Sequence, residues 1–284
     1  MTTATTNDEA TRPRLALSIP NMADPAALVE LGVRAEEAGW GGVFYWDHAH
    51  GSPAMPAPVA DPWVLLGALA IETDRIRIGT NITAAARRRP QKLARETVTV
   101  DHLSNGRLIF GVGLGEPPEE YTAYGDDSSR REIGERLDET LEVLEHMWSG
   151  KPFDHEGAHL TVRDAQFLPR PVQEPRIPVW TACAVPHTKP LERAARWDGV
   201  ALASLRDDGN IERVTADQIR TAVDVIDELR DPVAGPYDVA ISSPDIPTPG
   251  ELDELGAAGA TWVLVSRWVD ELPELIDLVS ADPR

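Results

Sequence analysis

The chain has 284 residues, of which 42% are hydrophobic and 26% charged, and its formal net charge is −20. Such a composition supports a sizeable buried core, and the length suits one barrel-type domain of roughly 250 residues. The negative charge disfavours nucleic acid and anionic membranes as partners. Cys183 is the only cysteine, which excludes an intrachain disulfide and a metal cluster held by thiolates.

The N-terminal segment, residues 1–13, is polar and has no apolar stretch, so we expect a disordered tail rather than a secretory signal. No segment approaches the ~20 consecutive apolar residues that a membrane helix needs. These features predict a cytoplasmic protein with one folded domain over residues 14–284.

Strand-like and helix-like segments alternate through the first half of the chain. Strands are expected at residues 14–19, 42–46, 76–80 and 107–112, and helices begin at Asp24, Asp61 and Pro90. Asp24 supplies an N-cap before a proline, and Gly39 is placed to end the first helix. Strands that alternate with helices indicate a parallel sheet, because each crossover must be long enough to hold a helix.

The second half continues the alternation with two interruptions. A loop over residues 116–131 precedes a long helix, and residues 152–171 are predicted to form an inserted hairpin. Four further strands are expected at residues 177–181, 199–203, 237–241 and 261–265, and Thr248 and Glu251 have capping-box spacing. Eight strands favour a closed (β/α)8 TIM barrel with the inserted hairpin and, after strand four, a loop long enough to act as a lid.

In such a barrel the chemistry lies at the C-terminal ends of the strands. Strand two ends in Asp47 and His48. His48 is a candidate proton donor or acceptor near neutral pH, with a carboxylate to orient it. The alternative is structural: Asp47 caps a loop, and His48 is a packed, hydrogen-bonded side chain.

Strand three leads into Thr80 and Asn81, whose short polar side chains are suited to hydrogen-bond the edge of a planar ring. Arg87 and Arg88 follow in a basic group that also contains Arg89. At a loop–helix junction on the catalytic face, these arginines predict an anion site such as one for phosphate. Alternatively, they are the solvated start of a helix.

Strand four ends in a glycine-rich run that includes Gly113 and Gly115 and is followed by Glu116. Glycine in a strand marks a close approach by a ligand or by another backbone. Room for a flat cofactor and a tight turn are therefore the two interpretations. A Rossmann fingerprint is excluded, because the glycine spacing differs and Pro117 stands where a helix would begin.

Strand five ends in Thr181 and Ala182, with Lys189 before the next helix. Thr181 and Lys189 are either phosphate contacts or, more simply, a cap and a solvated lysine. The lone cysteine, Cys183, is expected to be a packed hydrophobe rather than a nucleophile. The histidines of the predicted hairpin lack a third ligand, so no metal site is expected.

Several motifs, in chain order, resemble those of luciferase-like monooxygenases, the flavin- and F420-dependent barrel oxidoreductases. They are Ala35–Gly39, Trp46–His48, Arg89–Glu96, Val100–Leu108 running into Gly111–Gly115, Arg193–Gly199 and Ala257–Trp262. The run from Val100 to Gly115 is the most specific of them. The resemblance covers nearly everything from Leu15 to about Val265.

The resemblance implies a cofactor ring that lies across the barrel mouth. By matching position, the ring would be lined by His48, Thr80, Asn81 and Gly113. Thr181 and Ala182 stand where relatives often carry two glycines that receive the cofactor phosphate. Because of this departure, the phosphate site is expected to have shifted toward Lys189 or the arginine group.

With FMN as the cofactor, the resemblance implies a monooxygenase that receives reduced flavin from a separate reductase and oxygenates a small organic substrate. With F420, it implies hydride transfer in which oxygen plays no part. In both cases the hard chemistry belongs to the cofactor. His48 is then the expected proton-handling residue, and Glu116 is a second candidate on the substrate side.

Two functions from other classes stay open. One is a barrel that binds flavin without turnover. The other is a non-redox barrel enzyme that binds phosphate, which would need a lysine or a pair of carboxylates at the strand ends. Exposed helices on barrels commonly make dimers, so a homodimer is a further expectation.

Overall fold

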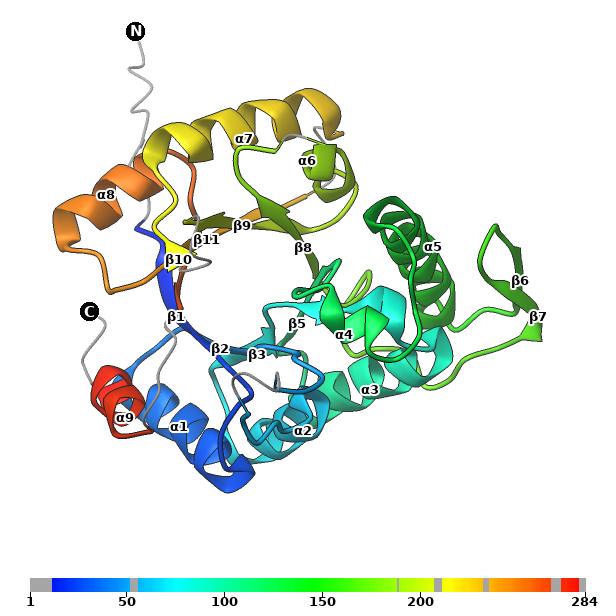
Figure 1. Ribbon diagram of the computed structural model, residues 1–284, viewed down its shortest axis with the longest axis horizontal. Helices are drawn as coiled ribbons and strands as arrows, with labels where there is room; N and C mark the ends of the chain where they lie inside the picture. The colour runs from blue at the N-terminus through cyan, green and yellow to red at the C-terminus, as the bar shows by residue number, and fades with distance from the viewer. Residues whose placement is uncertain are drawn as a thin grey trace, which may run out of the picture.

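Eight parallel strands close into a barrel at the centre of the computed structural model, and helices surround it (Figure 1). The strands are β1 (Arg14–Ile19), β2 (Gly42–Tyr45), β3 (Arg77–Thr80), β5 (Leu108–Gly113), β8 (Val179–Ala184), β9 (Gly199–Leu205), β11 (Asp238–Ser243) and β12 (Trp262–Ser266). Each pairs with the next in this order, and β12 pairs with β1, so the ring has no open edge. The structure describes residues 12–51, 56–187, 189–206, 211–231, 235–266 and 272–280. The predicted (β/α)8 barrel is therefore confirmed.

The helices that cover the barrel begin and end largely where local signals predict. They are α1 (Pro25–Ala38), α2 (Pro62–Glu72), α3 (Pro90–Leu103), α5 (Arg130–Trp148), α6 (Lys189–Ala194), α7 (Ala216–Leu229), α8 (Pro249–Ala257) and α9 (Leu272–Ser280). The Asp24 side chain caps α1 by accepting from the Ala27 N–H at 3.0 Å, and Gly39 ends it with a φ of 93°. Thr248 and Glu251 form the predicted capping box of α8. Among the helices of the described ranges, none is both long and apolar enough to cross a membrane.

Short elements interrupt the alternation. The predicted hairpin is confirmed as the antiparallel pair β6 (Phe153–Glu156) and β7 (Thr161–Ala165), which stands outside the barrel beyond α5 (Figure 1). β4 (Thr83–Ala84) and the 3₁₀ turn η1 (Ala85–Arg87) follow β3, and β10 (Ile211–Glu212) follows β9. The loop after β5 contains a short helix, α4 (Glu119–Thr122), which the sequence did not predict.

Two boundaries differ from the prediction. β8 runs past its predicted end at Thr181 to Ala184, because it stays paired with β9 as far as Ala203. Arg12, assigned to the tail, pairs with Asp253 of α8 at 2.5 Å, so contacts with the barrel helices extend to a residue before β1. Residues 1–11, the rest of the predicted tail, lie outside the described residues.

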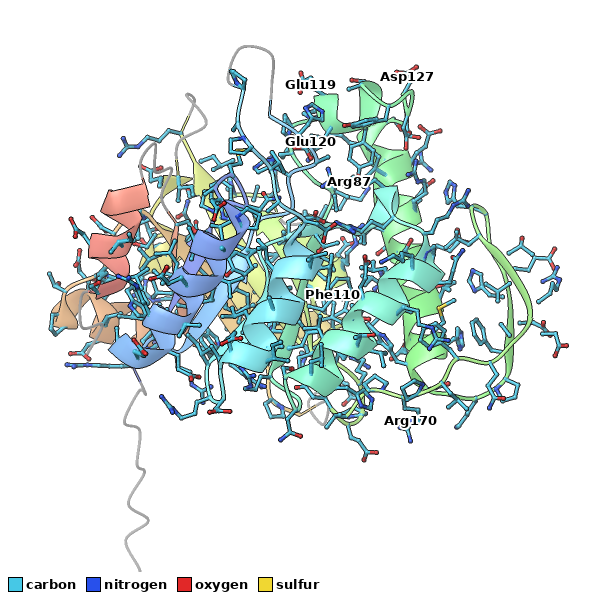
Figure 2. All side chains as sticks on the ribbon, turned by 90° about the horizontal axis from the view of Figure 1, so that it is seen from below. Arg87, Phe110, Glu119, Glu120, Asp127 and Arg170 are labelled. Carbon is cyan, nitrogen blue, oxygen red and sulfur yellow. The ribbon has the colours of Figure 1, made fainter. Side chains whose placement is uncertain are left out.

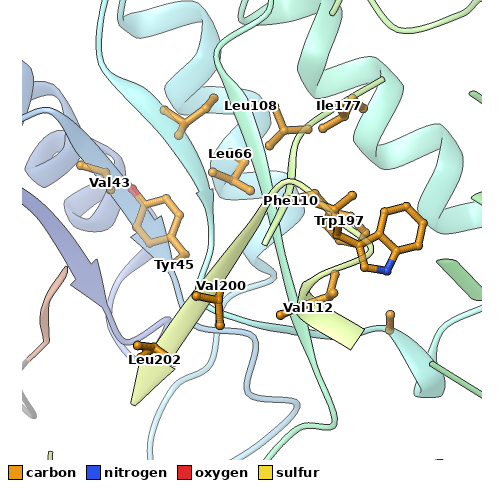
Figure 3. Packing of buried hydrophobic residues seen from close by; sticks show 14 of the residues in the cluster. Val43, Tyr45, Leu66, Leu108, Phe110, Val112, Ile177, Trp197, Val200 and Leu202 are labelled. Carbon is orange, nitrogen blue, oxygen red and sulfur yellow. The ribbon is translucent and has the colours of Figure 1, made fainter. Parts of the chain in front are cut away.

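Side chains alternate between the two faces of each barrel strand, because successive Cβ atoms point to opposite sides. Figure 3 shows part of the outward-facing set, in which Phe110 and Val112 of β5 and Val200 of β9 belong to one apolar cluster with Leu66 of α2. All four are fully buried. This layer between strands and helices forms the larger of the two apolar clusters of the core.

The inward face carries a smaller cluster that is rich in aromatic rings. Phe44 of β2 stacks on Trp180 of β8 with ring centroids 5.3 Å apart, and Trp262 of β12 lies edge-on to Phe44 at 6.3 Å. Trp180 and Trp262 stand near the N-terminal ends of their strands. The rings therefore fill the lower part of the barrel and leave its C-terminal mouth to other side chains.

The first part of the most specific motif, residues 100–108, secures the end of the barrel opposite the mouth. Arg107 is buried and donates to the carbonyl oxygens of Ala70 and Thr73 at the end of α2, at 2.8 and 2.7 Å. Asp101 accepts from the backbone N–H of Val172 at 2.6 Å and thereby ties down the segment that leads into β8. The motif thus satisfies buried backbone groups at the N-terminal ends of the strands.

We expect the Arg107→Met substitution to lower the free energy of unfolding by about 3 kcal/mol, because several buried carbonyls lose their donor while the apolar stem is kept. Chemical denaturation followed by tryptophan fluorescence measures the change. Arg75→Met is the control: its side chain is 74% exposed and lies 4.0 Å from Glu36. A similar small effect for both variants would contradict the role given to Arg107.

Candidate functional site

Charged side chains gather at the C-terminal end of the barrel, where β2, η1 and α4 meet. Figure 2 shows Arg87 and Glu120 at this end of the molecule, with Arg170 at the opposite end. The cluster consists of Asp47, His48, Arg87, Arg88 and Glu120, and we call it the mouth cluster. Each of its side chains is at most 19% exposed.

His48 is held through both its backbone and its ring. Its N–H donates to the Asn21 side-chain oxygen at 3.2 Å, and its carbonyl oxygen accepts from the Asn21 amide at 3.0 Å. Asn21 is fully buried in the segment between β1 and α1. The ring nitrogen Nδ1 lies 2.8 Å from Oε1 of Glu120. The carboxylate that contacts His48 is therefore Glu120 of α4 and not its chain neighbour Asp47.

Asp47 is bound instead by Arg88, which lies between η1 and α3 and contacts both carboxylate oxygens. The two contacts are 3.1 Å from Nε and 2.7 Å from Nη2. Arg87 joins the two halves of the mouth cluster, because it bonds the Glu120 carboxylate and the Asp47 backbone carbonyl. Both predicted alternatives for these arginines, an open anion site and a solvated helix start, are corrected: their charges are matched by internal carboxylates.

The pKa values of the two carboxyls move in opposite directions. Burial raises the pKa of Asp47, and its two arginine neighbours act against that shift. Burial acts on Glu120 in the same way, but the hydrogen bonds from His48 and Arg87 and the charge of Arg87 outweigh it, so the pKa of Glu120 is lowered. Glu120 is therefore a carboxylate at neutral pH.

The inward-facing side chains at the mouth are mostly small. Asn81 and Trp46 both donate to the Ser18 hydroxyl, at 3.0 and 2.8 Å. By strand alternation, the inward positions at the ends of the other strands are Gly113, Ala184, Ala203, Ser242 and Ser266. Small side chains above an aromatic floor fit a flat, flavin-type ring, which the resemblance implies.

Thr80 and Thr181 point the other way. Thr80 is in register with Tyr45 and Thr181 with Val112, and both partners belong to the cluster packed against the helices. The Thr80 hydroxyl donates to the Gly111 carbonyl oxygen at 2.8 Å, whereas the buried Thr181 hydroxyl has no partner within the described part of the chain. Any cofactor contact at these two positions would have to come from their backbone atoms. Ala182, next in sequence, faces the barrel interior.

The glycines in and directly after β5, the fourth barrel strand, differ in the reason for which a glycine is required. A Cβ on Gly111 would lie 1.9 Å from the Thr80 carbonyl oxygen, so there the close approach is by another backbone. Gly115 has a φ of 87°, which favours glycine at a turn. Gly113 faces the interior, and a Cβ there would meet Ile82 and Ala182 at 3.0 and 3.1 Å.

The remaining predicted residues lie at the surface. Glu116 pairs with Arg130 and its side chain is 57% exposed, so it does not belong to the mouth cluster. Arg89 and Lys189 are exposed, and among the residues that the structure describes neither has a carboxylate partner. Of the predicted phosphate contacts, these two therefore keep a positive charge that forms no ion pair with a described carboxylate.

Two other candidates have structural roles. Burial raises the pKa of the Cys183 thiol to about 12, which agrees with a packed side chain and not with a nucleophile. His155 of the hairpin lies 3.0 Å from Glu139 of α5, which also accepts from the backbone N–H of Leu160 at 2.8 Å. Glu139 therefore docks the hairpin on α5.

Sequence reasoning missed Glu120 and Asn21. Glu120 lies in the loop after strand four, for which only a length suited to a lid was predicted, and Asn21 follows the proline that ends β1. No local pattern separates Glu120 from its neighbour Glu119; the two differ because α4 turns Glu120 toward the barrel, where it is buried, and leaves Glu119 exposed. Tyr121 is buried and donates to the Leu114 carbonyl oxygen at 2.6 Å, which turns α4 toward the barrel.

Comparison with known proteins agrees with this geometry. A family model described as luciferase-like monooxygenase matches residues 3–242. The chain belongs to this family. Membership accounts for the order of the motifs along the chain and for the barrel.

Members of the luciferase-like family with curated names differ in their cofactor. The chain is 35% identical over 167 residues to an F420-dependent glucose-6-phosphate dehydrogenase of Microbacterium testaceum, covering 57% of this chain and 48% of the relative. It is 29% identical over 161 residues to the oxygenase component of a flavin-dependent trigonelline monooxygenase of Acinetobacter baylyi, covering 57% and 44%. The chain thus matches about half the length of these relatives.

A solved structure shows the same fold over most of the chain. The F420-dependent secondary alcohol dehydrogenase in complex with an F420-acetone adduct superposes with a TM-score of 0.76. The match covers 95% of this chain and 98% of that one at 18% sequence identity. At this identity the likeness shows the shared barrel alone.

The lowered pKa of Glu120 predicts an acid-sensitive contribution to the stability of this family member. The contribution is fully present above the unfolded-state pKa of about 4.3 and is lost as the pH falls through the lower folded-state pKa. We expect the difference in unfolding free energy between wild type and Glu120→Gln to be largest near neutral pH and to shrink in acid. Glu119→Gln, at an exposed position of α4, is the control and should show no such trend. A difference that is constant with pH would contradict the assignment.

Proposed function

We propose that the protein is an oxidoreductase that holds a flavin-type ring across the barrel mouth, with His48 handling a proton beside the ring. The observation that carries this proposal is the placement of His48 by Asn21 and Glu120, at the mouth of a barrel whose family includes F420- and flavin-dependent enzymes. A buried carboxylate and a clamped backbone hold an imidazole in one orientation, which general acid–base catalysis requires.

Other residues of the chain would bind and orient the cofactor. The bound cofactor would supply the two-electron chemistry. Asn81 and Ser18 would contact the ring edge, and the aromatic floor of Phe44 and Trp180 would support its lower face. Arg89 and Lys189 are the proposed phosphate contacts, since an anion at Arg87 or Arg88 would compete with Glu120 or Asp47.

Two finer assignments each have support. The sequence favours a monooxygenase that uses reduced FMN and oxygen on a small organic substrate, and the trigonelline monooxygenase relative agrees with it. In that case a separate flavin reductase would be a partner. The glucose-6-phosphate dehydrogenase relative, which is more similar, favours hydride transfer with F420. A cytoplasmic location, the homodimer and the absence of nucleic-acid and membrane partners remain part of the proposal.

Titration of the purified protein with FMN and, separately, with F420 decides between the two cofactors. The quenching of tryptophan fluorescence reports binding, because Trp46 lies at the mouth and Trp180 in the floor. We expect dissociation constants in the micromolar range for at least one cofactor. Preference for FMN supports the monooxygenase, preference for F420 supports hydride transfer, and binding of neither contradicts the proposed redox function.

We expect the His48→Gln substitution to lower turnover by about 10²- to 10⁴-fold, the range for loss of a general acid or base, while cofactor affinity changes only a few-fold. Steady-state kinetics and the same fluorescence titration measure the two effects. His102→Gln is the matched control, since that exposed histidine contacts the Arg170 carbonyl at the other end of the barrel. Unchanged turnover in His48→Gln would remove the role assigned to His48.

A further inference from the structure

The contact between His48 and Glu120 determines which ring nitrogen of the histidine carries the proton. Glu120 is ionised, and an ionised carboxylate only accepts hydrogen bonds. Its Oε1 lies 2.8 Å from Nδ1 of His48, so Nδ1 must be the donor. In the neutral imidazole the proton is therefore on Nδ1, and Nε2 carries the lone pair.

Further hydrogen bonds hold the Glu120 carboxylate in place, so the position of the proton on the His48 ring does not depend on one contact alone. Its second oxygen accepts from Arg87, and the backbone N–H of Ala49 also donates to the carboxylate. Arg87 in turn bonds the Asp47 carbonyl, one residue before His48. The carboxylate therefore cannot rotate away from Nδ1 without breaking a buried ion pair.

We propose that Glu120 is a positioning residue for His48: it holds the proton of the neutral ring on Nδ1 and makes Nε2 the atom that accepts a proton from a bound hydroxyl or amine. In that step the donor's O–H or N–H bond breaks and an Nε2–H bond forms. The ring becomes an imidazolium whose charge faces the Glu120 carboxylate. The proposal rests on the proposed function, because it assigns the direction in which His48 moves its proton.

The Glu120→Gln variant tests the proposal because Arg87 and His48, which each bond one carboxylate oxygen of Glu120, would then compete for the single amide oxygen. A glutamine has a single acceptor atom, and the Arg87 guanidinium makes the stronger, charge-assisted bond to it. The amide NH₂ group is then left for His48, which forces Nδ1 to accept and moves the neutral-ring proton to Nε2. The substitution therefore inverts the tautomer with little change in side-chain size. Glu120→Asp keeps the carboxylate and is the conservative variant.

The first readout is the ¹⁵N chemical shifts of the histidine rings in the full chain, at a pH where the His48 ring is neutral. The protein has seven histidines, and the His48→Gln variant identifies the His48 signals by their loss. We expect the Nδ1–H form in wild type, Glu119→Gln and Glu120→Asp, and the Nε2–H form in Glu120→Gln. An Nε2–H form in the wild type overturns the proposal, whatever the protein catalyses.

The second readout is turnover with the cofactor that the titration identifies. We expect Glu120→Gln to lose at least about 10²-fold in kcat, because its neutral His48 presents a proton where a lone pair is needed. Glu120→Asp should recover most of that loss, and Glu119→Gln should behave as wild type. An inverted tautomer with unchanged kcat would overturn the positioning role. If the wild type binds no cofactor, the proposed function fails while the tautomer result still decides the placement of the proton.

Discussion

The buried ion pairs of Arg87 and Arg88 hold together the part of the molecule where chemistry is proposed. Arg88 fixes Asp47 at the end of β2, and Arg87 links Asp47 to Glu120 on α4. Removing one partner of a buried pair costs about 3–5 kcal/mol, because the other charge is left uncompensated. The placement of α4 and the direction of the His48 ring depend on these pairs, because Glu120 of α4 contacts both Arg87 and His48. A charge reversal at either arginine would therefore disturb the fold of the site as well as any anion binding.

The N-terminal end of the barrel stabilises the fold, whereas the C-terminal end carries the residues with proposed chemistry. Family motifs occur at both ends. Arg107 and Asp101 satisfy backbone groups at the N-terminal end, where Glu36 also accepts from the N–H groups of Arg75 and Ile76 at 2.6 and 2.7 Å. None of these side chains lies near the mouth cluster. The first part of the most specific motif, residues 100–108, is thus structural, whereas the charged residues with proposed proton chemistry occur in shorter, less distinctive segments. This division is typical of TIM barrels, in which stability and activity reside at opposite ends.

The barrel mouth combines a rigid floor with small walls. Phe44, Trp180 and Trp262 pack against one another inside the strands, while serine, glycine and alanine occupy most inward positions above them. A flat cofactor needs such a space, and the proton chemistry beside it needs a histidine that does not reorient. The aromatic floor meets the first requirement, and the mouth cluster, through Asn21 and Glu120, meets the second.

The sequence by itself determined the eight strands, the capped helices, the inserted hairpin and the family, because these depend on local periodicity, capping residues and motif order along the chain. It also placed His48, Asn81 and Gly113 at the correct ends of their strands. Only the tertiary structure decided that Glu120 is the partner of His48, that Arg87 and Arg88 are neutralised internally, and that Thr80 and Thr181 face outward. These outcomes depend on strand register and on contacts between residues 33 to 72 positions apart, and no local pattern encodes either.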